Sequence, residues 1–485
     1  PRTTGVGIEC LRSRLPNPTM SESGRETGRS FSPAELQKIA ERHGIDIAEV
    51  SPRTPDERLS VLGQILSRQD VTFPVSAERA EAYFQAAAGG VPFTVGALSE
   101  TSVDLGEYAA EQHHDRYSFE EHLSWACLLS DQQRTKHQFA CREYLEGEEL
   151  FEIGGTVIPD YYILNARIYQ QTGWQLATVN MIIPAELFFT CHSYRFFPVT
   201  TFMRPLEQDY LQEPDIGHDV AGHVATFTIP TVAKLMQDHG KARDLIYAER
   251  DERLSKAGDE QQAKGICSRA DELLAYAERI YWFTVEFGLV MQDDALRAFG
   301  AGILSSPGET AYSVHSPAAN RILIDPSNEQ HLMRLVCTDY LISEYQKTYF
   351  ITQDFSLLES LTPERIVHAA EKAARVPHFS WRDVIPGDKV LNLGQAATTV
   401  NEKYYRLVAG QPMDDCMLRT AIRNMQVLSK ATDPLDDGTQ LDLKTLWSAP
   451  MPELPELVKG APIPEFKPQA SDVELKPISF VADYI

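Results

Sequence analysis

The chain has 485 residues, of which 43% are hydrophobic and 24% charged, and its formal net charge is −24. This length leaves room for two or three domains, or for one large domain with extensions. The negative charge argues against nucleic acid and against an anionic membrane surface as partners, because both would repel the protein. No apolar run is long enough to span a membrane, and the N-terminal residues lack the apolar segment of a secretory signal.

The cysteines give a first indication of the compartment. There are seven, at positions 10, 127, 141, 191, 267, 337 and 416, and no two form a Cys-x-x-Cys pair. An odd number of widely spaced cysteines argues against a disulfide framework and against a cysteine-rich zinc site. We therefore expect a reduced, cytoplasmic protein.

The N-terminal part divides into a polar segment and a helical region. Residues 1–30 are rich in Ser, Gly and Arg, and we expect them to be disordered or to include an added segment before Met20. Helical pattern begins at Ser32-Pro33-Ala34-Glu35, where Ser is a typical N-cap, Pro suits the first turn and Glu completes a capping box. Further helices are expected over about 55–68 and 77–88, so 31–104 is predicted to be a small helical region.

The middle of the chain, 105–360, is richest in aromatic residues and histidines, and we expect it to form the catalytic domain. Apolar spacing predicts a mainly α domain with a few short strands, without βαβ alternation or internal repeats. The predicted helices cover 118–130, 132–146, 159–172, 185–192, 230–247, 268–300 and 328–344, and the predicted strands lie near 175–183 and 320–324. The highly charged stretch 247–264 is expected to be a surface insertion.

The remaining residues, 361–485, are predicted to be a C-terminal extension. Helices are expected over 362–374 and 413–429. From residue 433 the chain is rich in Pro and Asp, which is typical of an extended segment.

Two histidines in the segment EPDIGHDVAGH (213–223) are the first candidate metal ligands. His218 and His223 are five residues apart, which places them about 140° apart on an ideal helix. This spacing differs from the His-Glu-x-x-His motif of zinc proteases, and it requires a bend or a helix end that Gly222 could permit. By itself the pair could equally be two unrelated histidines.

Glu286 is the third candidate, because it is the one carboxylate in the apolar run IYWFTVEFG (280–288). A buried carboxylate needs a cation or a hydrogen-bonding partner. Arg279 or Arg297 could provide the partner. Two imidazoles and one carboxylate on one face of a metal instead form the facial triad of non-haem Fe(II) oxygenases.

Three motifs in fixed order then resemble the pterin-dependent aromatic amino acid hydroxylases, and the bacterial phenylalanine 4-hydroxylases most closely. They are EPDIGHDVAGH, YWFTVEFGL and FGAGILSSPGE, and further matches are IPAELFF (183–189), YRFFPVTTFMR (194–204), DYLQEPD (209–215) and EYQKTYF (344–350). The resemblance covers about 105–360. It implies the helical catalytic domain of that family, with helical N-terminal and C-terminal extensions added here.

The resemblance also implies a role for each matching position. His218, His223 and Glu286 match the iron ligands. Arg204 matches the arginine that pairs with the carboxylate of the amino acid, a task suited to the guanidinium fork. The other implied substrate residues are Trp282, Ser305 and Glu309, and the implied pterin-binding residues are Ile182, Ile183, Phe188 and Asp219.

The implied activity is ring hydroxylation of an aromatic amino acid, phenylalanine by default, with Fe(II), a tetrahydropterin and O₂. Two alternatives stay open, and Asn180-Met181, which stands where the family usually has glycine, motivates the second of them. One is the same chemistry on tryptophan, tyrosine or a non-standard aromatic substrate, and the other is a metal-binding protein that has lost hydroxylation. A third, an Fe(II)/2-oxoglutarate enzyme using His113-His114-Asp115, conflicts with the helical pattern, since that chemistry is found on a strand-rich barrel.

Overall fold

The computed structural model describes residues 31–89, 103–206, 213–340, 345–375, 378–379, 384 and 388–394. Within these ranges the chain is mainly helical and has short strands, which confirms the predicted fold class. The segment 1–30, the predicted helix 413–429 and the Pro/Asp-rich tail lie outside the described residues. No helix in the described ranges combines the length and the apolar character that crossing a membrane requires.

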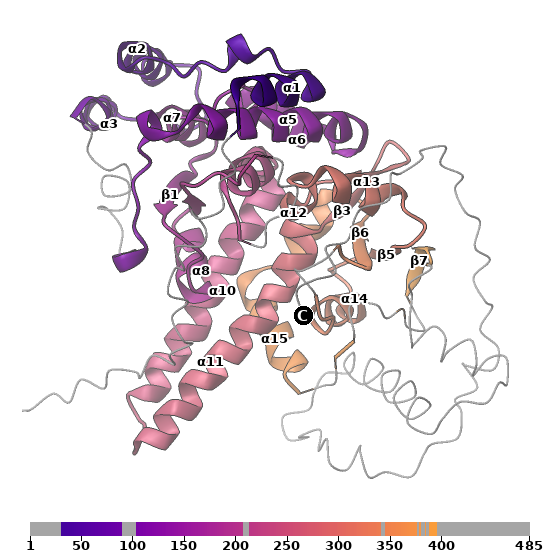
Figure 1. Cartoon of the computed structure of the whole chain (residues 1–485). Coiled ribbons are helices and arrows are strands. Elements are labelled where there is room, and N and C mark those ends of the chain that lie inside the picture. Colours follow the sequence, from indigo (N-terminus) through magenta and orange to yellow (C-terminus); the bar gives the residue numbers. More distant parts are fainter. Residues whose placement is uncertain are drawn as a thin grey trace, which may run out of the picture.

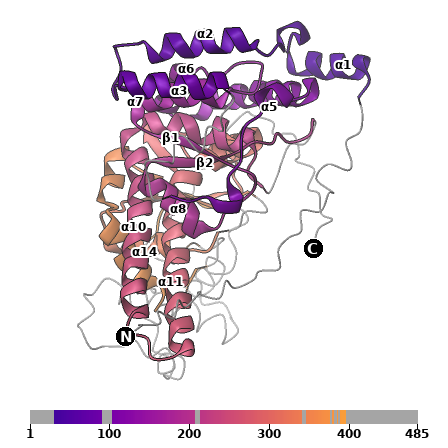
Figure 2. The same cartoon turned by 90° about the vertical axis from the view of Figure 1, so that its left-hand side faces the viewer.

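Three helices form a layer at one end of the molecule (Figures 1 and 2): α1 (Pro33–His43), α2 (Pro55–Leu66) and α3 (Ala77–Gly89). The capping box predicted for the first helix is present, because Ser32 Oγ accepts from the Glu35 amide and the Glu35 carboxylate accepts from the Ser32 amide. The apolar face of α1 packs on the helix α5 (Phe119–Phe139), and that of α2 packs on the helix α7 (Tyr161–Thr172).

The helix α5 corrects one prediction. It runs without interruption from Phe119 to Phe139, so the two helices predicted over 118–130 and 132–146 are wrong. The break falls later, at Ala140 and Cys141, and α6 (Arg142–Phe151) follows it. The Cys141 amide donates to the Ala298 carbonyl (2.9 Å), so the position of the break is fixed by a contact with a distant strand.

A small parallel sheet lies below these helices (Figure 2). Strands β1 (Gln175–Val179) and β2 (Phe196–Thr200) pair along their whole length, with Gln175 opposite Phe196 and Val179 opposite Thr200. Helix α8 (Ala185–Ser193) connects them. Every residue of both strands is buried. This unit brings the segment implied in pterin binding next to the centre of the domain.

Two long helices, α10 (Pro230–Leu254) and α11 (Glu260–Tyr281), run side by side and extend away from the body of the molecule (Figure 1). The charged stretch 247–264, predicted to be a surface insertion, covers the end of α10, the connection and the start of α11, and only Tyr247 and Ala263 within it are buried. The first part of α10 and the last part of α11 belong to the main core. The two helices pack there on α8 and on α15 (Pro363–Ala373).

The predicted helix 268–300 is wrong in its second half. The helix α11 ends at Tyr281, a π-helical turn η7 covers Trp282–Glu286, and an antiparallel hairpin of β3 (Leu289–Gln292) and β4 (Ala295–Ala298) follows. The turn of the hairpin holds Asp293 and Asp294 at positive φ (51° and 59°), a conformation that Asp tolerates better than most residues. The apolar residues of this segment have helical spacing, so the sequence predicted a helix where the short hairpin lies.

The hairpin belongs to a five-stranded sheet of order β4-β3-β6-β5-β7, which also contains β5 (Asn320–Ile324), β6 (Thr348–Thr352) and β7 (Lys389–Asn392). Helices α12 (Ala301–Leu304), α13 (Pro307–His315) and α14 (Glu329–Val336) lie between these strands in the chain. The predicted helix 328–344 is therefore too long. Helix α15 packs in the main core and β7 pairs with β5, so contacts cross the predicted boundary at residue 360. The domain limits themselves stay predictions.

Short 3-10 turns complete the described elements. They are η2 (Ile47–Glu49), η3 (Gly106–Tyr108), η4 (His114–Arg116), η6 (Val224–Thr228) and η8 (Phe355–Ser360).

Candidate iron and substrate site

Three side chains from distant segments meet in the centre of the domain: His218, His223 and Glu286. The Nε2 atoms of the two imidazoles lie 3.2 Å apart, His223 Nε2 lies 3.1 Å from Glu286 Oε1, and His218 Nε2 lies 3.8 Å from Glu286 Oε2. One ligand atom from each residue falls within 4.8 Å of the others, the only such group of three or more acidic, His or Cys side chains within the described ranges. The structure thus brings together the three residues proposed as metal ligands.

The spacing of the two histidines is explained by an unusual helical turn. Residues Asp219–His223 form the π-helix η5, which directly follows α9 (Ile216–His218). A π-helix bonds residues five apart, so it brings positions 218 and 223 to the same side, which an α-helix cannot do. A helix end near His223, one of the two predicted possibilities, is present, since the π-helix ends there and a 3-10 helix begins at Val224, but Gly222 does not adopt the positive φ that glycine alone adopts freely. Gly222 is required for packing instead, because a Cβ atom there would lie 2.8 Å from the Ala301 carbonyl oxygen.

Glu286 also lies at the end of a π-helical turn. The Phe287 amide donates to the Trp282 carbonyl (2.8 Å), a bond between residues five apart. The alternative partners considered from the sequence are engaged elsewhere, since Arg279 pairs with Asp339 (2.7 Å) and Arg297 donates to the Gln138 carbonyl. Both segments that carry candidate ligands therefore contain a π-helical turn, and such turns are frequent at functional sites.

The chemistry of the triad fits a metal cation. Burial alone would raise the pKa of Glu286, but the adjacent His223 and His218 hold it below its ordinary value. Burial lowers the pKa of His218 to about 4, so at neutral pH its imidazole keeps a lone pair for a metal. Glu286 Oε2 is buried and accepts no hydrogen bond from the described residues. Ligand atoms about 2.1 Å from an ion and at right angles to each other lie roughly 3 Å apart, close to two of the three observed distances.

The hydroxyl of Ser305 orients one of the histidines. His218 Nδ1 lies 3.0 Å from Ser305 Oγ, which in turn donates to the Gly302 carbonyl (3.2 Å). Because that oxygen uses its own proton on Gly302, it accepts the Nδ1 proton of His218 and leaves Nε2 free to bind a metal. The resemblance implies Ser305 near both substrate and ligands, and the structure places it against a ligand.

Replacing Ser305 by alanine is expected to weaken metal binding about 10- to 100-fold, because the ring of His218 loses the partner that fixes its tautomer. The affinity for Co(II) can be measured in competition with a chromophoric chelator. Ser313→Ala is the matched control, since Ser313 is also buried and donates to a carbonyl, that of Thr310 (3.1 Å), outside the triad. Equal affinities in the two variants would contradict this role.

Arg204 is buried and forms a bidentate ion pair with Asp215. Its Nε donates to Asp215 Oδ2 and its Nη2 to Asp215 Oδ1, both at 2.7 Å, and its backbone amide also donates to Oδ2 (3.0 Å). The same carboxylate caps the turn that carries His218, accepting from the His218 amide (3.0 Å). The residue implied in substrate binding is therefore rigidly coupled to the candidate metal ligands.

Two aromatic residues implied in substrate and pterin binding, Trp282 and Phe188, pack against other rings. Trp282 stacks on Tyr340, with ring centroids 4.8 Å apart, and on Phe287 at 5.7 Å. The ring of Phe188 lies 4.3 Å from that of His192. Phe188 and Trp282 are both partly buried, so each retains an accessible surface on which a planar ligand could stack.

The other residues implied in pterin binding are placed differently. Ile182 is 55% exposed, whereas Ile183 is buried in the core. Asp219 is also buried, and its Oδ2 accepts from both the amide and the hydroxyl of Thr200 (2.7 Å each). Burial raises the pKa of Asp219 to about 7. In this arrangement Asp219 joins the end of β2 to the turn carrying the histidines.

Glu309, implied as a pocket residue, is buried at the start of α13, where its Oε1 accepts from the Tyr349 hydroxyl (2.7 Å) and the Gln346 amide (3.3 Å). Burial raises its pKa from the ordinary 4.5 to about 7. Between these values the folded protein keeps a proton that the unfolded chain releases. This group therefore favours folding most below pH 4.5, and its contribution is lost as the pH rises through about 7.

Glu309→Gln is accordingly expected to flatten the pH dependence of stability. From pH 5 to pH 8 the free energy of unfolding of the metal-free wild type should fall more steeply than that of the variant, by up to roughly 3 kcal/mol. Urea unfolding at both pH values measures the difference. Identical pH slopes in the two proteins would show that Glu309 is not protonated near neutrality in the folded state.

Sequence reasoning missed three buried aromatic neighbours of the triad: His192, Phe197 and Tyr281. The Phe197 ring lies 4.5 Å from that of His223. His192 is fully buried, with Nδ1 2.8 Å from the Phe188 carbonyl and Nε2 3.3 Å from the Tyr281 hydroxyl, and burial lowers its pKa to about 3. His192 and Phe197 lie inside quoted motifs or next to them, but no spacing rule distinguishes them from core residues.

The histidine of the alternative His-x-Asp motif lies elsewhere. His113 is exposed, with its Nε2 3.6 Å from Glu111 Oε2, and Asp115 is exposed as well. Within the described ranges neither residue belongs to a group of candidate metal ligands, so the structure gives no support to a 2-oxoglutarate enzyme.

Comparison with known proteins agrees with this site. Residues 107–371 match the model of the family described as biopterin-dependent aromatic amino acid hydroxylase. The chain is 35% identical over 294 residues to phenylalanine-4-hydroxylase of Chromobacterium violaceum, covering 60% of this chain and 90% of the relative. It is 33% identical over 306 residues to phenylalanine-4-hydroxylase of Caulobacter vibrioides, covering 63% and 95%.

A solved structure shows the same fold. The crystal structure of C. violaceum phenylalanine hydroxylase with bound iron(III) and the oxidised cofactor 7,8-dihydrobiopterin superposes with a TM-score of 0.50 at 34% identity, covering 62% of this chain and 98% of that protein. The family match spans more than half of the present chain and contains all three residues of the triad. This chain belongs to the biopterin-dependent aromatic amino acid hydroxylase family. The predicted enzyme class, a pterin-dependent aromatic amino acid monooxygenase, is thereby confirmed.

Proposed function

We propose that this chain hydroxylates the ring of an aromatic amino acid, phenylalanine by default, with Fe(II) held by His218, His223 and Glu286 and with a tetrahydropterin as reductant. The observation that supports this most directly is the convergence of two imidazoles and one carboxylate on two π-helical turns within the family-matched segment. The relatives named above are phenylalanine hydroxylases, which makes phenylalanine the first substrate to test.

Iron and a reduced pterin, when bound, supply the activation of O₂ that ring hydroxylation requires. The protein's own part is to hold three ligands on one face, so that other positions remain open. Phe197, which is buried with its ring 4.5 Å from that of His223, would help to exclude water from the site.

The substrate side of the site is proposed to centre on Arg204. Its guanidinium, already oriented by Asp215, would receive the carboxylate of the amino acid. Trp282 would contact the aromatic ring, and Ser305 and Glu309 would border the same space. On the cofactor side, Phe188 would stack on the pterin, with Ile182, Ile183 and Asp219 around its edge.

The test combines metal analysis with a tetrahydropterin-dependent assay. The purified protein is expected to bind one iron per chain, to consume O₂ only with both pterin and an aromatic amino acid, and to yield a hydroxylated product. A panel of phenylalanine, tyrosine and tryptophan identifies the substrate. Tight iron binding without O₂ consumption for any pair would instead favour the alternative of a metal-binding protein that has lost hydroxylation.

A cytoplasmic location is part of this proposal. In the described part of the chain Cys141, Cys191 and Cys337 are buried and form no disulfide. Cysteines that do not form disulfides are typical of a reducing compartment. Fractionation of cells that express the protein would test the location.

A further inference from the structure

A single main-chain carbonyl behind the triad receives two side-chain donors. The oxygen of Ala221, midway along the π-turn between His218 and His223, accepts from Lys136 Nζ (2.7 Å) and from the Tyr144 hydroxyl. Ala221, Lys136 and Tyr144 are all buried, with exposed fractions of 1% or less. Two donors on one buried carbonyl indicate that the position of this turn is held from outside the turn itself.

The reason for external support is the change of winding. The chain passes from the π-helix Asp219–His223 directly into the 3-10 helix Val224–Thr228. Where bonding changes from a five-residue to a three-residue spacing, carbonyls lose regular partners within the helix and need others. Lys136 from α5 and Tyr144 from α6 supply donors at this point.

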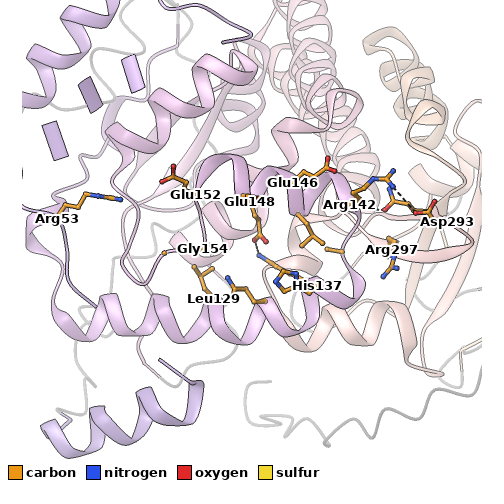
Figure 3. Close-up of a pocket in the computed structure, with 17 residues that line it drawn as sticks. Arg53, Leu129, His137, Arg142, Glu146, Glu148, Glu152, Gly154, Asp293 and Arg297 are labelled. Atoms are coloured by element: carbon orange, nitrogen blue, oxygen red, sulfur yellow. Dashed lines mark hydrogen bonds and ion pairs between the residues drawn. The ribbon is translucent and has the colours of Figure 1, made fainter. Parts of the chain in front are cut away.

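The lysine is costly to bury and is paired accordingly. Its ammonium lies 2.5 Å from Glu148 Oε1, and the Tyr144 hydroxyl lies 3.3 Å from the same oxygen. Glu148 and Lys136 both line a pocket of about 750 Å³, and Figure 3 shows Glu148 there. Because a buried ion pair rarely adds much net stability, a stability role alone does not explain its presence.

The same face of α5 contacts the triad at a second point. Gln132 lies one turn before Lys136, is fully buried, and donates to the Ser305 carbonyl (2.8 Å). Ser305 in turn orients His218 through its hydroxyl. The packing leaves little space for movement, since a Cβ atom on Gly147 of α6 would lie 2.5 Å from the Ala225 carbonyl oxygen. One helix thus supports both His218 and the turn that leads to His223.

We propose that Lys136 is a positioning residue for the metal site: by holding the Ala221 carbonyl it keeps His218 and His223 in the relative placement that binds iron. This inference rests on the proposed function, because it assumes that the triad binds a metal. Glu148 keeps the ammonium of Lys136 charged and in place. Tyr144 donates a second hydrogen bond to the same Ala221 carbonyl.

The test uses Lys136→Met and the double variant Lys136→Met/Glu148→Met, with Co(II) as the probe in titrations against a chromophoric chelator. Both variants are expected to bind Co(II) about 10- to 100-fold more weakly than the wild type, the range typical of residues that orient metal ligands. The visible absorption of bound Co(II) should also change, since it reports ligand geometry. The double variant removes both charges together and therefore should fold even if the single variant does not.

Lys372→Met is the matched control. Lys372 is also buried and paired with a glutamate, Glu329 (2.8 Å), but it lies on α15 and not on α5 or α6, which carry the donors to the Ala221 carbonyl. It should leave Co(II) affinity and spectrum unchanged. Lys136→Gln, which retains a donor without the charge, should recover part of the affinity.

Co(II) binding distinguishes failure of the positioning role from failure of the proposed function. If the double variant binds Co(II) with wild-type affinity and spectrum while the wild type binds one ion per chain, the positioning role is overturned and the proposed function stands. If the wild type binds neither Co(II) nor Fe(II), the proposed function fails, and the positioning role fails with it.

Discussion

Glu286→Gln is expected to abolish iron binding and with it the hydroxylase activity. The amide keeps the size of the side chain but removes the negative charge, and it is a poor ligand for a metal cation beside the two imidazoles. We expect kcat/KM to fall by at least about 10³-fold, roughly 4 kcal/mol of transition-state stabilisation. Iron content per chain and tetrahydropterin-dependent product formation measure the two losses.

The control for this variant is Glu278→Gln. Glu278 lies eight residues earlier on α11 and burial raises its pKa to about 7, so it too is a largely desolvated carboxyl, but it is outside the triad. Its replacement should leave iron content near the wild-type value. A further readout is thermal: added Fe(II) should raise the unfolding temperature of the wild type and of Glu278→Gln, but not that of Glu286→Gln. Full iron loading in Glu286→Gln would refute the assignment of the triad.

Arg204→Lys is the second change with a large expected effect. Lysine retains the charge but not the planar fork, so it cannot reproduce the two bonds to Asp215 and at the same time present a donor pair to the substrate. We expect KM for the amino acid to rise about 100-fold, equivalent to roughly 2.7 kcal/mol, with a smaller change in kcat. Steady-state kinetics at saturating pterin separates the two parameters.

A similar ion pair elsewhere in the fold provides the comparison. Arg334 and Asp388 are also buried and linked through two guanidinium nitrogens, with Nε 3.0 Å from Oδ1 and Nη2 3.2 Å from Oδ2. Arg334→Lys should cost stability to a similar extent, since both changes disturb a buried pair. Only Arg204→Lys should raise KM. If the two variants show the same KM, Arg204 is a structural residue and the carboxylate of the substrate binds elsewhere.

Local signals in the sequence predicted several elements correctly. The start of α1 follows from Ser32 and Glu35, whose capping box needs nothing beyond four consecutive residues. The mainly helical class and the exposed character of 248–262 follow from apolar spacing and charge, which depend on the nearest neighbours along the chain.

Non-local packing accounts for the errors. The stretch 268–300 has helical spacing throughout, but its helix stops because the chain enters a sheet at Leu289. Gly288 and Gly300 permit this close approach, since a Cβ atom on Gly300 would lie 2.3 Å from the Glu286 carbonyl oxygen. The break after α5 is likewise set by the bond from Cys141 to Ala298. Such contacts join residues far apart in the chain and leave no periodic pattern.

The triad shows most clearly which features follow from the sequence and which depend on the tertiary structure. The sequence by itself determined which residue types were available: two histidines in one segment, and one carboxylate in an apolar run that needs a cation or a partner. Ordered motifs then indicated the family. The tertiary structure alone decided how a five-residue spacing becomes a metal-binding geometry. It did so through π-helical turns at His223 and Glu286, because a π-turn is stable only where packing and outside donors such as Lys136 compensate its irregular bonding.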